Sequence, residues 1–361
     1  MSPDDLESHL TPEDLENLPG AFEFIDTESA DDFLLALRTV ALRKQKEHVG
    51  RPPLRWAFRG QASADWRLTP SALRDGAKLG YESGDFYKVN KVNPNAELQM
   101  IAEFSAVRQF LLECDEAGLP VPGDSQAARS MAFVRRTVLE ALSRHEWPPP
   151  PLLDLFAFAQ HHRVPTRLLD FTACYQRAAY FAASSVAERP TVEGRLAVWA
   201  LDLDFLQVAS RFYNKSGLVR VTAPSATNTF LRAQRGFFLC AERSESIHLD
   251  DVLSRMAAVG HAMAKRFGWG GIDHSWRAGV KVTCPADAYE PILDILEALG
   301  VHKASIYPTY AHVVERLEGR RTILEDLGAV TTSGQIDPKD IMSPEMAEWL
   351  DAHGDGDPFS V

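Results

Sequence analysis

Several features are missing from this chain of 361 residues, and each absence excludes a class of protein. No apolar run approaches the ~18 uninterrupted residues that a membrane-spanning helix needs, so we expect no membrane segment. The four cysteines are scattered without close pairs, which indicates neither a zinc knuckle nor a disulfide framework. No HExxH, P-loop or GxGxxG motif occurs, and we expect no bound metal. The first residues resemble no signal peptide, and free thiols fit a reducing compartment, so we expect a cytoplasmic protein.

Positive charge is missing from the N-terminal end. Residues 1–37 contain no lysine or arginine, and residues 337–361 contain one cation, Lys339. These ends are typical of solvated or weakly ordered acidic arms. The formal net charge of −12 disfavours a protein that binds nucleic acid over its whole surface, although a local basic patch remains compatible with it.

The hydrophobic pattern predicts a mixture of helices and short strands. Hydrophobic residues make up 45% of the chain, which allows a sizeable core. Helical periodicity or composition covers residues 30–44, 97–113, 127–144, 152–160, 173–187 and 288–299. Short apolar runs predict strands at 54–58, 168–171, 196–201, 237–240 and 279–282. Their irregular spacing favours an α+β fold, with mixed or antiparallel small sheets and surrounding helices, over regular βαβ winding.

The densest polar stretch is residues 160–172, which read QHHRVPTRLLDFT. His161 and His162 are adjacent, so at most one of them faces any given site. A histidine can orient a ribose hydroxyl or act as an acid or base, and it can equally fill a capping or core position. If the end of this stretch is a strand, Thr166, Asp170 and Thr172 share one face, as in a ligand cleft. Alternatively, Asp170 or Thr172 caps the alanine-rich helix that follows.

Two shorter polar clusters accompany this stretch. Arg59 and Gly60 follow a predicted strand, where an arginine can hold a phosphate and a glycine lets a backbone approach closely. The alternative is that Arg59 pairs with a carboxylate such as Asp170 and only stabilises the fold. Gln234 lies between two arginines and before a glycine-aromatic run, where it either binds a ligand or caps a backbone. Cys174 with His161 and Asp170 has the residue types of a hydrolase, but the spacing favours simple packing.

Together these motifs resemble the FRG-domain family, whose members are mostly bacterial. The likeness rests on residues 58–61, 160–161 with 165–172, and 232–237, and it spans about residues 21–317. The implied organisation is an acidic arm at 1–20, an FRG domain at 21–317 with a helical insertion at about 90–150, and an acidic tail at 318–361. At the positions of His162, Arg163 and Phe171 the family usually has an aromatic residue, glycine and tryptophan.

The order of the motifs is similar to that of ADP-ribosyltransferases, which implies an ADP-ribosyltransferase-like core with NAD as the substrate. By this likeness the catalytic residues are Arg59, His161 and Gln234. The implied NAD-binding residues are Arg59, Gly60, Gln61, Thr166, Arg167, Asp170 and Thr172. Gln234 takes the place of the usual catalytic glutamate, and because a glutamine cannot act as a base, Glu242 is a possible substitute.

The implied function is that of an NAD-dependent ADP-ribosyltransferase or NAD glycohydrolase, as a toxin or phage-defence effector that modifies a protein or RNA target. The alternative is a non-catalytic nucleotide- or RNA-binding module that acts with a protein partner. A local basic cleft would then be formed by Arg59, Arg163, Arg167, Arg232 and Arg235. In a third interpretation the acidic arms hold an antitoxin or another effector subunit.

Overall fold

The computed structural model describes residues 20–43, 56–77, 79, 96–133, 147–189, 191, 193–210, 218–222, 229–241, 248–267 and 277–326. The chain divides into two compact units, Met1–Ile306 and Tyr307–Val361. In the second unit, helix α14 (Tyr310–Asp326) begins after Thr309, whose Oγ1 accepts a hydrogen bond from the main-chain N–H of His312 at 3.2 Å. Among the described helices, none is both long and apolar enough to cross a membrane.

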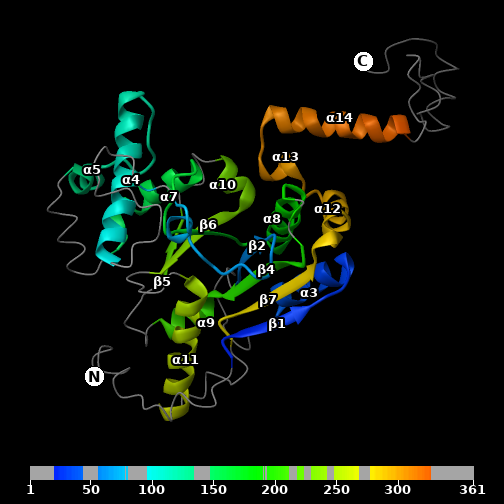
Figure 1. Cartoon of the computed structure of the whole chain (residues 1–361), viewed down its shortest axis with the longest axis horizontal. Coiled ribbons are helices and arrows are strands. Elements are labelled where there is room, and N and C mark those ends of the chain that lie inside the picture. Colours follow the sequence, from blue (N-terminus) through cyan, green and yellow to red (C-terminus); the bar gives the residue numbers. More distant parts are fainter. Residues whose placement is uncertain are drawn as a thin grey trace, which may run out of the picture. The chain divides into compact units, whose positions relative to one another are not determined.

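One seven-stranded sheet runs through the first unit (Figure 1). In spatial order its strands are β1 (Phe22–Asp26), β7 (Gly279–Pro285), β4 (Arg195–Asp202), β2 (Trp56–Gln61), β3 (Leu169–Thr172), β6 (Gly236–Ala241) and β5 (Leu218–Val221). The pair β1–β7 is parallel, and every other pair is antiparallel. The predicted mixture of helices and strands is confirmed, but one open mixed sheet replaces the small sheets that the sequence predicted.

The sheet is held together weakly in its middle. β2 pairs with β4 along all six of its residues, whereas it pairs with β3 only at Phe58 and Thr172. The sheet therefore has two halves, β1-β7-β4-β2 and β3-β6-β5, which meet at one residue pair. Beyond that pair, starting at Arg59, the two strands part.

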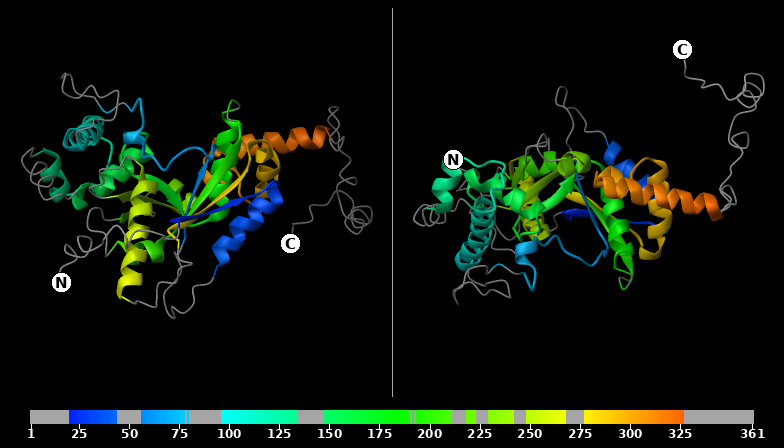
Figure 2. Two further views of the ribbon diagram at one scale, coloured as in Figure 1. Left: turned by 60° about the horizontal axis from the view of Figure 1, so that its bottom comes forward. Right: turned by 90° about the horizontal axis from the view of Figure 1, so that it is seen from above.

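Helices cover both faces of the sheet (Figures 1 and 2). One face carries Phe171, Trp199 and Leu239, and it packs against α9 (Leu203–Ala209) and α11 (Leu249–Phe267). On the opposite face, three helices cover the half that contains β2, namely α3 (Ala30–Leu42), α8 (Tyr175–Ala187) and α12 (Tyr289–Ala298). The other half is covered on that face by α4 (Ala96–Glu116) and α7 (Leu153–His161).

Most predicted elements are confirmed, with shifted ends. The strand predicted at 54–58 continues to Gln61, so Arg59 and Gly60 are strand residues rather than loop residues. The helix predicted at 127–144 is described only as α5 (Gln126–Phe133), and its remainder lies outside the described residues. β1, β5 and α11 were not predicted. The remaining short elements are η2 (Ser71–Leu73), η4 (Pro150–Leu152), α10 (Thr229–Gln234), η5 (Ala286–Ala288) and α13 (Lys303–Ile306).

Gly60 lets β2 and α8 pack backbone against backbone. A Cβ atom at this position would lie 2.0 Å from the main-chain oxygen of Ala178 and 2.6 Å from the nitrogen of Ala182. Both distances are far below van der Waals contact, and main-chain atoms cannot move aside as a flexible side chain does. The glycine of this motif is therefore required by helix-to-strand packing.

We expect Gly60→Ala to lower the free energy of unfolding by about 3 kcal/mol, because α8 must shift away from the sheet. Urea unfolding followed by circular dichroism measures the loss. Gly260→Ala in α11 is the matched control, since its Cβ would meet Ala209 Cβ at an ordinary 3.4 Å. Equal stabilities for the two variants would contradict this account of Gly60.

Candidate functional site

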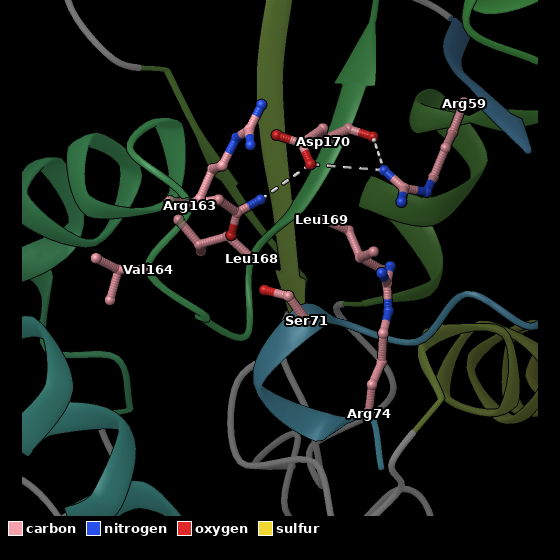
Figure 3. Close-up of a pocket in the computed structure, with 9 residues that line it drawn as sticks. Arg59, Ser71, Arg74, Arg163, Val164, Leu168, Leu169 and Asp170 are labelled. Carbon is pink, nitrogen blue, oxygen red and sulfur yellow. Dashed lines mark hydrogen bonds and ion pairs between the residues drawn. The ribbon is translucent and has the colours of Figure 1, made fainter. Parts of the chain in front are cut away.

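A cavity with a volume of about 270 Å³ lies between β2 and β3, and basic side chains surround it (Figure 3). Its walls come from β2, from η2 and the residue after it, from the end of α7 with the loop that follows, and from β3. The lining residues are Arg59, Ser71, Arg74, Gln160, Arg163, Val164, Leu168, Leu169 and Asp170.

Arg59 bridges the two halves of the sheet with its side chain. Its Nη1 donates a hydrogen bond of 2.8 Å to the main-chain oxygen of Asp170 and lies 3.7 Å from Oδ2 of the same residue. The guanidinium thus satisfies a carbonyl of β3 where β2 supplies no strand partner. Its Nε is buried and has no hydrogen-bond partner among the described residues. Burial lowers the pKa of Arg59 and the Asp170 charge opposes this, but an arginine remains charged at neutral pH.

Hydrogen bonds of Thr166 hold the residues of the cavity wall in place. This residue is fully buried, and its Oγ1 donates to Gln160 Oε1 and accepts from the main-chain N–H of Leu168. The Ser71 hydroxyl accepts from the N–H of Thr166 and donates to its carbonyl, both at 3.1 Å. Gln160 Nε2 in turn donates to Asp170 Oδ2 at 3.0 Å. A chain of hydrogen bonds therefore runs from η2 through Thr166 to the carboxylate in the cavity.

Arg74 and Arg163 complete the basic lining. The sequence analysis included Arg163 in the alternative basic cleft and did not assign Arg74 to any site. Arg74 follows η2, and its Nε donates to the Thr69 carbonyl at 3.0 Å. Burial lowers the pKa of Arg74, an effect that the Asp170 charge opposes and the Arg189 charge reinforces. Figure 3 shows the guanidinium groups of Arg59 and Arg163 on either side of Asp170. No local sequence signal marks Arg74, because only the path of the chain after β2 and η2 brings it to the cavity.

The charges around the cavity do not balance. Three guanidinium groups, those of Arg59, Arg74 and Arg163, face one carboxylate, that of Asp170, which leaves two positive charges in excess among the lining residues. Asp170 is mostly exposed, so its charge is screened more than that of the buried Arg59. The cavity is therefore suited to a ligand with at least two negative charges, and arginine matches phosphate oxygens in geometry.

Two of the predicted binding residues point into the fold instead. The side chain of Gln61 is buried and donates to the Arg67 carbonyl at 3.1 Å, while its Oε1 accepts from Trp199 Nε1 at 2.9 Å. Gly60 lies against α8, as described above. Both neighbour Arg59 in the strand and do not line the cavity.

Arg167 takes part in a buried ion pair outside the cavity. Its Nε and Nη2 donate to the two carboxylate oxygens of Glu103 in α4 at 2.6 and 3.0 Å. The Glu103 side chain is 0% exposed and that of Arg167 is 6% exposed. Trp147 Nε1 and Gln99 Nε2 also donate to this carboxylate. The pair therefore anchors α4 to the start of β3.

Thr172 connects the predicted second and third motifs. Its Oγ1 donates to the main-chain oxygen of Gln234 at 2.8 Å and accepts from the N–H of Cys174 at 3.1 Å, just before α8. Cys174 is the N-cap of α8 and no side chain caps the first turn, so Thr172 does not cap the helix as the alternative predicted; it binds the N–H of the residue before the helix. The contact also places the end of α10 beside the residue pair where the two halves of the sheet meet.

The remaining predicted residues lie near the cavity without lining it. Burial lowers the pKa of His161, the neighbouring charge of His162 lowers it further, and the Asp170 charge opposes both effects. The His162 ring packs at 4.6 Å from that of Phe158, and neither histidine is among the residues that line the cavity. Glu242 lies outside the described residues. No cluster of metal-ligating side chains occurs in the part of the chain that the structure describes.

The fold and site thus define a mixed α/β domain with an arginine-lined cavity where its sheet divides. Residues 54–190 match the family model of the FRG domain. The matched residues contain the first two motifs and all the residues that line the cavity, whereas Gln234 lies beyond them. No curated protein and no solved structure matches the chain.

We expect Glu103→Gln to lower the free energy of unfolding by about 3 kcal/mol, because it leaves the buried Arg167 charge uncompensated. Urea unfolding measures this loss. The control is Arg43→Gln, which breaks a half-exposed ion pair with Glu23 and is expected to cost no more than about 1 kcal/mol. A Glu103→Gln protein as stable as the control would show that the pair does not anchor α4.

Proposed function

We propose that the FRG domain binds the phosphate groups of a nucleotide between Arg59, Arg74 and Arg163, and that this nucleotide is NAD. The observation that carries the proposal is the convergence of three guanidinium groups from three separate segments on one cavity with a single lining carboxylate. Such an arrangement would repel a cationic ligand and bind an anion through charge-assisted hydrogen bonds. The choice of NAD rests on the likeness of the motif order to ADP-ribosyltransferases.

The size of the cavity limits what it encloses. Ligand pockets commonly have volumes from about 300 to 1,000 Å³, so 270 Å³ is slightly below this range. A volume of this size suits a phosphate group with one sugar better than a whole dinucleotide. In this proposal the diphosphate of NAD contacts the arginines, and the rest of the molecule extends beyond the cavity.

The proposed reaction is cleavage of the bond between nicotinamide and ribose. Nicotinamide leaves with the bonding electron pair, and a nucleophile on a target, or water, attaches to the ribose carbon through an oxocarbenium-like state that negative charge stabilises. The contact between Thr172 and Gln234 supports a role for the third motif, because it brings Gln234 close to the strand that contains Asp170.

A second candidate function is nucleotide or RNA binding without turnover, together with a protein partner. This function is favoured because the one carboxylate that lines the cavity already has partners. Asp170 accepts a hydrogen bond from Gln160 and lies beside Arg59. The amide of Gln234 cannot act as a base. The roles of toxin or phage-defence effector, and an antitoxin partner, stay predictions from the family resemblance.

Binding of NAD and ADP-ribose by the purified full chain tests the first proposal. Using isothermal titration calorimetry at low salt, we expect Arg74→Gln and Arg59→Gln each to weaken binding about tenfold, because each removes a charge-assisted hydrogen bond. Arg43→Gln, which removes a cation outside the cavity, is expected to bind as the unaltered protein does. Absence of binding by the folded, unaltered protein would contradict the proposal.

Release of nicotinamide from NAD, followed by chromatography, separates the two candidate functions. If the protein cleaves NAD, we expect Gln234→Ala to lower the rate about a hundredfold while binding of ADP-ribose is retained. Cleavage that is unaffected by Gln234→Ala would remove Gln234 from the mechanism. Binding without any nicotinamide release would favour the non-catalytic module.

A further inference from the structure

Arg163 adopts a backbone conformation that favours glycine. Its φ angle is 67°, in the left-handed region that side chains with a Cβ rarely occupy. The conformation ends α7, where the N–H of Arg163 donates to the Gln160 carbonyl at 2.9 Å and the N–H of Val164 donates to that of Ala159 at 3.0 Å. Glycine is the most common residue at such a helix end. The turn allows Val164 to pack against the core, so the fold requires the conformation but not the arginine.

The side chain at this position has no structural partner in the described part of the chain. Arg59 donates to the Asp170 carbonyl and Arg74 to the Thr69 carbonyl, whereas the exposed guanidinium of Arg163 makes no hydrogen bond or ion pair there. It nevertheless lines the cavity and lies beside Asp170 in Figure 3. Arg163 thus combines a strained backbone conformation with a guanidinium that has no partner among the described residues and that lines a cavity. This combination indicates that the side chain binds a ligand.

We infer that Arg163 is a ligand-binding residue that sets the charge requirement of the cavity, which takes a diphosphate in preference to a singly charged group. This inference rests on the proposed function and adds the ligand class to it. With Arg163, three cations face one carboxylate and the excess is two positive charges, which matches the two negative charges of a diphosphate diester such as that of ADP-ribose. Without Arg163, the excess is one, which a singly charged group neutralises as well.

A helix-capping role is the competing explanation. A cation near the C-terminus of a helix interacts favourably with the helix dipole, so an arginine after α7 would stabilise the fold without any ligand. The two explanations predict opposite changes in stability. If Arg163 caps the helix, the Arg163→Gly variant is less stable than the unaltered protein. If Arg163 binds a ligand, the variant is at least as stable, because glycine relieves the backbone strain.

The test measures binding and thermal stability on the same full-chain variants. With inorganic pyrophosphate and ADP-ribose as probes in calorimetry, we expect Arg163→Gly to bind each about tenfold more weakly. Its unfolding midpoint is expected to be equal or higher by about 2 °C. Arg163→Lys keeps the charge and is expected to retain most of the affinity. Adenosine, which carries no charge, is expected to show no difference between the variants.

Arg235→Gly is the matched control. Arg235 is the other described residue besides glycine with a positive φ, at 47°, and it does not line the cavity. We expect the Arg235→Gly variant to have an unfolding midpoint similar to that of Arg163→Gly, and to bind pyrophosphate with the affinity of the unaltered protein. Equal pyrophosphate affinity for Arg163→Gly and the unaltered protein would overturn the inference while the proposed function stands. If the unaltered protein binds neither pyrophosphate nor ADP-ribose, the inference and the proposed function are both overturned.

Discussion

The hydrogen bond from Arg59 to the main-chain oxygen of Asp170 is the contact on which the cavity depends. A sheet that divides in its middle leaves main-chain groups without strand partners, and these groups need other hydrogen-bond partners. Here a side chain replaces the missing strand donor. Because that side chain is an arginine, the same hydrogen bond also places a positive charge at the point where the sheet divides. The structural role of Arg59 is therefore compatible with its proposed role in ligand binding, since the same geometry allows both.

Polar residues of the central motif fall into two groups with different surroundings. Asp170 and Arg163 reach the cavity, whereas Thr166 and Arg167 use their polar atoms on partners inside the protein. The buried residues fix where the exposed ones lie: Thr166 links η2 to Gln160, and Arg167 connects β3 to α4. A motif can thus be dense in polar residues although only some of them meet a ligand.

The sequence predicts local structure here better than the way in which elements meet. Continuous apolar residues predicted β4, and alanine content with helical spacing predicted α8. β1 escaped prediction because it is an edge strand of only five residues that exposes Phe24, so it lacks the continuous apolar run that identified the predicted strands. The single sheet and its weak junction depend on register between distant strands, which no local pattern contains. For the same reason, proximity of Arg59 to Asp170 was predictable from the motifs, but the contribution of Arg74 was not.

The pairing of strands that are far apart in the sequence, such as β1 with β7, affects how the domain folds during synthesis. β1 begins at Phe22 and its partner at Gly279, and β2 depends on β4, which begins at Arg195. The matched FRG residues end at 190, before either partner has been synthesised. On the ribosome, β2 and its arginine therefore emerge long before the strands that flank them, and contacts of such long sequence separation form slowly. The sheet therefore extends well beyond the segment that matches the FRG model, and a fragment cut at the limits of the match would expose unpaired strand edges.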